Sequence, residues 1–244
     1  MSRAREDLIT KNIHSTDWNE YTEDRKYIHS KIIEHFMSNY SSVDCGSPKD
    51  AILLGGGSNS GKSTIREDLP KNVVLIDPDE IKEKIPEYNH YKKKYSNFAA
   101  FYVHDESSDI GDTLLTESID LEYPFIYDGT MKHTSKYKAI IEELREKDYF
   151  ITIVIVDVPL DLAHKRNKAR FEATGRAVPE DIVDETHRAI PASFLKLKGL
   201  VDEYYLFDTR NGKPVLVAQK KQDYGEKIFK EQLYYEFLSK HRNK

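Results

Sequence analysis

Residues 56–63 read Gly-Gly-Ser-Asn-Ser-Gly-Lys-Ser and fit G-x-x-x-x-G-K-[ST], the pattern of the phosphate-binding P-loop. The apolar run at 51–54 predicts a strand before this loop, and residues 63–67 can open a helix after it. The glycines let the backbone curl until its N–H groups point at phosphate oxygens, and the helix N-terminus adds the positive end of its dipole. A strand, a glycine loop and a helix in this order constrain the chain to an α/β fold that binds a nucleoside triphosphate.

Composition narrows the class of protein further. A length of 244 residues suits a large α/β domain with decorations, although two small domains would also fit. The chain has 39% hydrophobic residues and a mean hydropathy of -0.67, with no apolar run near the ~18 residues that a membrane helix needs. Neither a signal peptide nor an intrachain disulfide is expected, since the N-terminus is polar and Cys45 is the only cysteine. We therefore predict a cytoplasmic protein, and the formal net charge of -5 argues against general nucleic-acid binding.

Apolar and polar segments alternate along the chain. Strands are expected at 51–55, 73–76, 125–127, 150–156 and 204–207. Helices are expected at about 61–69, 98–119, 135–147 and 160–172, with one or two more in 179–198. This alternation predicts a three-layer α/β P-loop kinase fold with a five-stranded, mostly parallel sheet. Residues 1–46 are expected to form a helical N-terminal extension, 47–212 the kinase domain, and 213–244 an edge strand at 214–218 and a helix at 225–240 packed on the same domain.

The predicted nucleotide site follows from the loop. We expect ATP to bind the residues of the loop and the start of its helix: Gly56, Gly57, Ser58, Asn59, Ser60, Gly61, Lys62, Ser63 and Thr64. Lys62 should reach the β- and γ-phosphates, and Ser63 should offer its hydroxyl to Mg²⁺. The sequence has neither the Asn-Lys-x-Asp motif of GTPases nor the Leu-Ser-Gly-Gly-Gln motif of ABC-type ATPases. A small kinase-like domain is the remaining class.

A kinase needs a carboxylate that takes the proton of the acceptor hydroxyl. Asp77 and Asp79 follow the second strand, and Asp79 is the candidate base, although it could instead be the N-cap of a helix. Asp77 is interpreted as a structural partner or a ligand of metal-bound water. Asp128 ends the third strand and could serve Mg²⁺ or substrate, or be an ordinary turn residue, whereas Asp157 suits a structural or nucleotide-edge role.

A kinase also needs arginines that neutralise the transferred phosphoryl group. Arg166 and Arg170 are four residues apart and share a helix face, and Arg176 follows a flexible Thr-Gly turn. We expect phosphate contacts from Arg170 and Arg176, with a solvated basic helix as the alternative. Arg66 is interpreted as a surface or ion-pairing residue. The lysines at 92–94 most simply form a solvated face, and could also attract an anionic acceptor.

Several blocks together resemble the zeta toxin family over about residues 50–210. They are the P-loop, Ile-Asp-Pro-Asp-Glu-Ile-Lys at 76–82, Asp-Gly-Thr at 128–130, Arg-Phe-Glu at 170–172 and Gly-Arg-Ala-Val-Pro at 175–179. The chain departs from the family at two places. Ser-Asn stands where the family's loop usually has Pro-Gly, and Asp-Gly-Thr stands for Glu-Gly-Thr, which shortens one carboxylate by a methylene.

The resemblance implies an ATP-dependent kinase that phosphorylates the 3′-hydroxyl of the amino sugar in UDP-N-acetylglucosamine and is often restrained by an antitoxin. It implies Asp79 as general base and Arg170 and Arg176 as phosphate ligands. Thr130 would fall in the sugar-nucleotide site, and Asp112 near the acidic substrate-binding position. The extension at 1–46 could dock an antitoxin, or could simply complete the core. Other acceptors stay open, namely another nucleotide-sugar, a dinucleotide or a polynucleotide end, as does a non-catalytic nucleotide-binding regulator.

Overall fold

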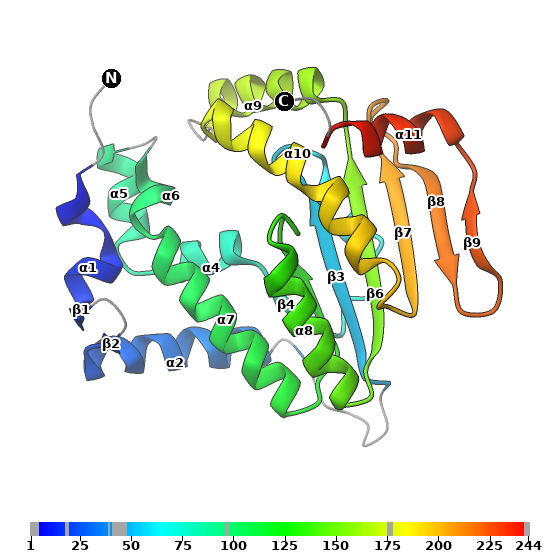
Figure 1. The fold of residues 1–244 in the computed structure, drawn as a ribbon. Helices are drawn as coiled ribbons and strands as arrows, with labels where there is room; N and C mark the ends of the chain where they lie inside the picture. Colours follow the sequence, from blue (N-terminus) through cyan, green and yellow to red (C-terminus); the bar gives the residue numbers. More distant parts are fainter. Residues whose placement is uncertain are drawn as a thin grey trace.

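A computed structural model describes residues 5–17, 20–38, 40, 48–95, 98–174 and 178–241 of this chain as a sheet flanked by helices (Figure 1). The strands are β1 (Ser15–Asp17), β2 (Glu20–Tyr21), β3 (Asp50–Gly56), β4 (Val74–Ile76), β5 (Phe125–Asp128), β6 (Phe150–Asp157), β7 (Glu203–Asp208), β8 (Val215–Lys221) and β9 (Gly225–Ile228). The α-helices are α1 (Thr10–His14), α2 (Glu23–Ser38), α3 (Lys62–Arg66), α4 (Pro78–Lys84), α5 (Tyr88–Tyr95), α6 (Ala99–Tyr102), α7 (His104–Asp120), α8 (Thr134–Glu146), α9 (Leu160–Thr174), α10 (Glu180–Leu197) and α11 (Glu231–Ser239). Cys45 and Arg176 lie outside the described residues.

The main sheet has seven strands in the order β4-β5-β3-β6-β7-β8-β9. The first five pair in parallel, as expected from helices that alternate with strands. The sequence predicted a five-stranded sheet and an edge strand at 214–218. The structure has two antiparallel strands in this part of the chain, β8 and β9, so the sheet has two strands more than five. Residues 225–228 were predicted to start a helix but form β9. The chain turns back after β8 and pairs with it in antiparallel, through a turn that ends at Gly225, whose φ of 69° suits glycine.

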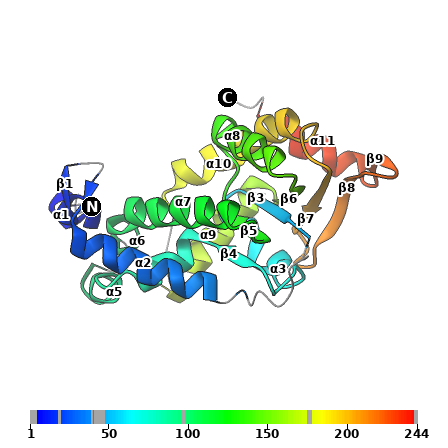
Figure 2. The ribbon, with the colours of Figure 1, turned by 90° about the horizontal axis from the view of Figure 1, so that it is seen from below.

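The two faces of the sheet carry separate apolar clusters, because successive side chains of a strand point to opposite sides. Ala51 and Leu53 of β3 belong to the large cluster, which also includes buried residues of α2, α7, α8, α10 and α11. Leu54 belongs to the smaller cluster, which α3 covers with Ile65. Figure 2 shows α8 and α10 on one side of the strands and α3 on the other. The predicted three-layer α/β architecture is confirmed, with a thin third layer.

The helices between 88 and 120 differ from the prediction. The segment expected as a single helix over 98–119 breaks at Val103 into α6 and α7. The lysines at 92–94 lie in α5, a helix that was not predicted, and all three are exposed. Their exposure agrees with the interpretation as a solvated face.

The described part of the N-terminal segment packs on α7 through a buried ion cluster. Arg25 of α2 is 3% exposed and donates to both carboxylate oxygens of Glu106 and of Glu87. Ile32 and Phe36 of the same helix join the large apolar cluster. Within the described residues no helix is long and apolar enough to cross a membrane.

Candidate active site

The P-loop joins β3 to α3 at the carboxyl ends of the parallel strands, and Figure 1 shows these ends directed toward α9 and α10. Asn59 and Gly61 have φ values of 61° and 93°, which is the left-handed region that curls the loop. A Cβ on Gly57 would lie 2.4 Å from the ring of His187, so glycine is required there by close packing. Ser63 and Thr64 are exposed at the start of α3, where their hydroxyls and the Ser63 N–H can meet phosphate oxygens.

Lys62 and Asp128 face each other beside the loop. The Lys62 Nζ donates to the carbonyl oxygen of Gly56 at 3.4 Å and lies 3.9 Å from Asp128 Oδ1. Burial raises the pKa of Asp128 to about 6, against the opposing charges of Lys62 and Arg66. A buried carboxylate beside the phosphate-binding lysine suits a metal or a polarised ligand better than an ordinary solvent-exposed turn.

Arg66 gathers three carboxylates at this point. Its Nη1 bonds Asp77 Oδ2 and donates to Asp128 Oδ2 at 3.2 Å, and its Nη2 donates to Glu80 Oε1 at 2.8 Å. The sequence interpretation of Arg66 as an ion-pairing residue holds, and its partners come from the start of α4 and the end of β5. Arg66 therefore joins the P-loop helix to the elements that carry the candidate base.

The structure gives the N-cap position of α4 to Asp77 and not to Asp79. Helix α4 begins at Pro78, and its N-cap is Asp77, whose Oδ1 accepts from the Asp79 N–H at 2.8 Å. The alternative interpretation of Asp79 as the N-cap is therefore wrong, because Pro78 fixes the helical φ one residue earlier. Asp79 lies in the first turn with a side chain that is 55% exposed, and it pairs with Lys82 at 2.8 Å.

The predicted acceptor residues lie around this rim. Asp112 is exposed on α7 and pairs with Lys136 of α8 at 2.6 Å. The Lys136 Nζ lies 5.6 Å from the centroid of the Tyr127 ring, one residue before Asp128. Thr130 follows β5, and its carbonyl oxygen accepts from the Gly56 N–H at 3.3 Å. Asp112 is thus linked through α8 to the end of β5, while Thr130 contacts the P-loop directly.

Helix α9 holds the outside of the loop. Arg166 donates to the carbonyl oxygens of Asn59 and Ser60 and to Thr209, so its guanidinium ties the loop to β7. These contacts do not support Arg166 as a phosphate ligand in this arrangement. Asn167, which sequence reasoning missed, accepts from Asn59 Nδ2 at 3.1 Å. Arg170 lies one turn further along α9 and is half-buried, and Arg176 follows outside the described residues.

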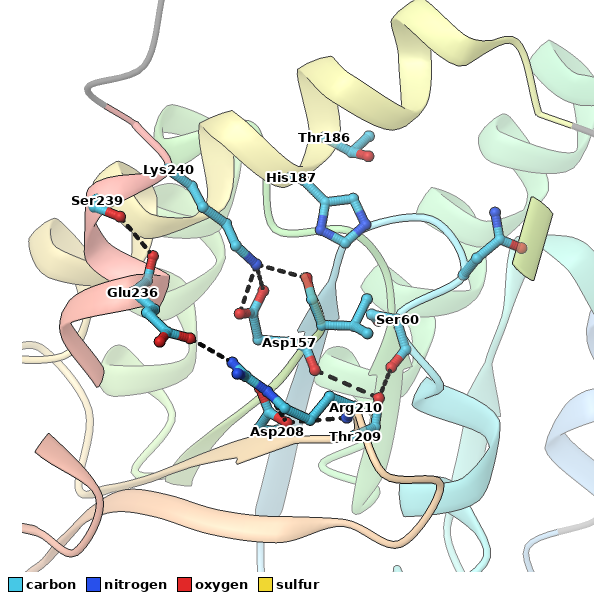
Figure 3. Close-up of polar contacts among 12 residues, drawn as sticks. Ser60, Asp157, Thr186, His187, Asp208, Thr209, Arg210, Glu236, Ser239 and Lys240 are labelled. Carbon is cyan, nitrogen blue, oxygen red and sulfur yellow. Dashed lines mark hydrogen bonds and ion pairs between the residues drawn. The ribbon is translucent and has the colours of Figure 1, made fainter. Parts of the chain in front are cut away.

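Further loop contacts escaped the sequence analysis because their partners are distant in the chain. Figure 3 shows Thr209, Asp157 and Lys240 below and beside His187. Thr209 donates to the Ser60 carbonyl oxygen at 2.6 Å, and Lys240 donates to both oxygens of Asp157 at 2.6 Å. These contacts support the structural alternative for Asp157.

The donor set fits Mg²⁺. Ser63 offers an exposed hydroxyl, and Asp128 a carboxylate, on the same rim. Among the described residues no group of three His, Cys, Asp or Glu side chains is arranged to hold a metal by itself. Mg²⁺ commonly takes one or two protein oxygens and completes its shell with phosphates and water, so this sparse set suits it.

A P-loop on a parallel sheet of this order, with acidic residues at the carboxyl ends of β4 and β5, defines the class of P-loop kinase folds. The sequence profile described as Zeta toxin matches residues 34–222. The chain therefore belongs to the zeta toxin family, as its motifs indicated.

Individual relatives agree with this family. The toxin PezT of Streptococcus pneumoniae serotype 4 is 27% identical over 126 residues, which cover 50% of this chain and 50% of that toxin. Toxin zeta of Streptococcus agalactiae is 28% identical over 191 residues, which cover 73% of this chain and 66% of that toxin. The chain thus matches half to two thirds of the length of these relatives.

Solved structures share the fold at low identity. The PezAT toxin–antitoxin system of Streptococcus pneumoniae gives a TM-score of 0.68 at 20% identity, covering 91% of this chain and 95% of that chain. The complex AvrRxo1-ORF1:-ORF2 with ATP gives a TM-score of 0.71 at 17% identity, covering 91% and 74%.

Proposed function

We propose that this chain is an ATP-dependent kinase, a phosphotransferase that moves the γ-phosphate of ATP to a sugar hydroxyl of UDP-N-acetylglucosamine. Its membership of the zeta toxin family and its P-loop on a kinase-type sheet support the class of reaction. The AvrRxo1 structure with ATP supports the donor. The nucleotide-sugar acceptor rests on the motif resemblance around Asp79, Asp112, Asp128 and Thr130.

The feature that supports this function most directly is the link from the P-loop helix to the candidate base. Arg66 leaves α3 one turn after Lys62 and bonds Asp77, which in turn caps α4, the helix whose first turn carries Asp79. The phosphate-binding lysine and the carboxylate are therefore fixed in one polar unit. Phosphoryl transfer depends mainly on this kind of positioning of donor, acceptor and base.

Each group has a defined role in the transfer. Asp79 lies in the first turn of α4 with an accessible carboxylate, and it would accept the proton of the acceptor hydroxyl. Lys62 and the arginines Arg170 and Arg176 neutralise charge on the transferred phosphoryl group. Ser63 and Asp128 would hold Mg²⁺, which would supply further neutralisation of phosphate charge. Asp112 and Thr130 would hold the acceptor.

A protein partner forms part of the proposal. The PezAT relative is a toxin–antitoxin system, and we expect an antitoxin to restrain this chain by binding at the N-terminal region. The described part of that region packs firmly on α7 through Arg25 and Glu106, so it can present a fixed surface. Co-expression with the neighbouring gene product and gel filtration would detect such a complex.

The reaction can be tested with purified protein, Mg-ATP and UDP-N-acetylglucosamine, followed by mass spectrometry for a product heavier by one phosphate. Asp79→Asn should lower the turnover by at least about 10²-fold and leave ATP affinity within about threefold, because general-base contributions are typically 10²–10⁴-fold. Asp68→Asn is the matched control, since Asp68 is an exposed aspartate after α3. Normal turnover by Asp79→Asn would refute this base.

The acceptor is tested separately with a metabolite extract. Phosphorylation of another nucleotide-sugar or of a dinucleotide, with none of UDP-N-acetylglucosamine, would keep the kinase and replace the acceptor. ATP binding without ADP formation on any acceptor would instead identify a nucleotide-binding regulator.

A further inference from the structure

Two neighbouring side chains of α10 hold the backbone of Ser58 in the P-loop. The Ser58 N–H donates to Thr186 Oγ1 at 3.3 Å, and His187 Nε2 donates to the Ser58 carbonyl oxygen at 2.9 Å. Thr186 Oγ1 also donates to the Val183 carbonyl oxygen at 2.9 Å, which orients its lone pairs toward Ser58. Both α10 residues are 2% exposed. Ser58 is thus bound at both backbone groups by residues about one half of the chain away.

The imidazole of His187 also fits against Gly57. A Cβ on Gly57 would lie 2.4 Å from the Nε2 and Cδ2 atoms of the ring. Because a carbonyl oxygen only accepts, Nε2 carries the proton of the neutral ring. Burial lowers the pKa of His187 to about 4, so the ring is neutral at physiological pH. Its Nδ1 is buried without a hydrogen-bond partner among the described residues.

A cavity of about 350 Å³ lies beside the ring, lined by His187, Asp157, Arg188, Arg210 and Lys240 among others. In Figure 3 the His187 ring lies between Lys240 and the P-loop residue Ser60. The ring is therefore not packed tightly from every side. Its contact with Ser58, together with the fit against Gly57, is what fixes its position.

The bonds to Ser58 divide the loop into two parts. Ser58 is held from outside by α10, and Asn59 Nδ2 is held by Asn167 of α9. The Ser60 and Thr64 N–H groups donate to the carbonyl oxygens of Gly57 and Gly61 and so keep the loop curled. The N–H groups of residues 61–63 remain for phosphate. An oriented set of N–H groups binds an anion without the cost of ordering the loop at that moment.

We propose that Thr186 and His187 are positioning residues that hold the P-loop in its phosphate-binding conformation through the backbone of Ser58. This role rests on the proposed nucleotide site, and neither residue touches the reacting atoms. Helix α10 packs against α9, which carries Arg170.

The test compares His187→Leu with His187→Gln. Leucine fills part of the space without a donor, whereas the glutamine amide can donate from a position near Nε2. Isothermal titration of Mg-ADP and Mg-ATPγS should show about a tenfold higher Kd for the leucine variant, which corresponds to about 1.4 kcal/mol. Glutamine should restore the Kd to within about threefold of the wild type.

Two further variants separate positioning from general stability. Thr186→Val keeps the shape, removes the acceptor for the Ser58 N–H, and should raise the Kd about three- to tenfold at an unchanged unfolding temperature. His164→Leu is the matched control, since His164 is a partly buried histidine of α9 that pairs with Asp184. It should leave the Kd unchanged.

The steady-state prediction is a higher KM for ATP with the KM of the acceptor unchanged. Equal nucleotide affinity in His187→Leu and the wild type would overturn the positioning role. Equal losses in the leucine and glutamine variants would also overturn it, because packing rather than the hydrogen bond would then be responsible. A wild-type protein that binds Mg-ADP but phosphorylates nothing would refute only the proposed kinase. One that binds no nucleotide would refute both.

Discussion

The ion pair between Lys240 and Asp157 is a decisive place to test the electrostatics of this fold. The ammonium of Lys240 donates to both Asp157 oxygens and to the Val158 carbonyl oxygen, each at 2.6 Å. The two side chains are only 15% and 11% exposed. Lys240→Met keeps most of the hydrocarbon stem and removes the charge, so it leaves a buried carboxylate at the end of β6.

The expected cost follows from this burial. Removing one partner of a buried pair typically costs about 3–5 kcal/mol, and the residual exposure here places the loss at about 2–3 kcal/mol at pH 7. For a chain of this size that corresponds to a fall of about 5–10 °C in unfolding temperature. Lys165→Met is the control, because the Lys165–Asp161 pair is 74% and 72% exposed and should contribute little.

The pH dependence has a definite sign. Burial raises the pKa of Asp157 above its unfolded value even with Lys240 present, and removal of the lysine raises the pKa further. Above that pKa the folded variant must keep a buried charge. As the pH falls through it, the folded state takes up a proton and the loss relative to the wild type shrinks.

The assay is urea or thermal unfolding of the wild type, Lys240→Met, Asp157→Asn and the double variant between pH 5 and pH 8. The double variant should recover part of the loss, because no buried charge is then left unpaired. A Lys240→Met protein as stable as the wild type would contradict the reasoning. A loss that stays constant from pH 8 to pH 5 would contradict it as well.

Two further predictions concern other charged groups. Arg66→Ala should lower kcat at least about tenfold and raise the KM for ATP far less, because Asp77 and Glu80 lose the tie to the P-loop helix; steady-state kinetics against Arg145→Ala, an exposed surface arginine, would show whether the loss is specific. Burial alone would raise the pKa of Glu106, but hydrogen bonds from His29 and Arg25 lower it to about 2. Glu106→Gln should therefore destabilise the protein by about 2–4 kcal/mol at pH 7. The difference in unfolding free energy between the wild type and Glu106→Gln should become smaller as the pH falls from about 4 toward 2. A difference that does not change with pH would refute the ionised pair.

Much of the architecture was predictable because its signals are local. The P-loop pattern needs only consecutive residues, and apolar runs such as 150–156 mark buried strands by themselves. The parallel direction of the strands follows from the helices between them. Because the carboxyl ends of parallel strands lie at the same edge of the sheet, Asp79 and Asp128 were expected on one rim. The C-terminal hairpin was only half predicted, because β9 is a strand through its pairing with β8.

The sequence by itself determined the phosphate-binding loop, the class of the sheet and the family, since each depends on residues close together in the chain. Tertiary structure alone decided which polar groups these side chains contact. Arg166 bonds the carbonyl oxygens of the loop, Arg66 binds three carboxylates from α4 and β5, and His187 contacts Ser58 across more than a hundred residues. No local pattern encodes such partners, because they come from how β-strand ends and helices pack in space. Because strand ends and helices from distant parts of the chain pack together at the rim of the sheet, this rim is both the site of the predicted chemistry and the part whose contacts were least predictable from the sequence.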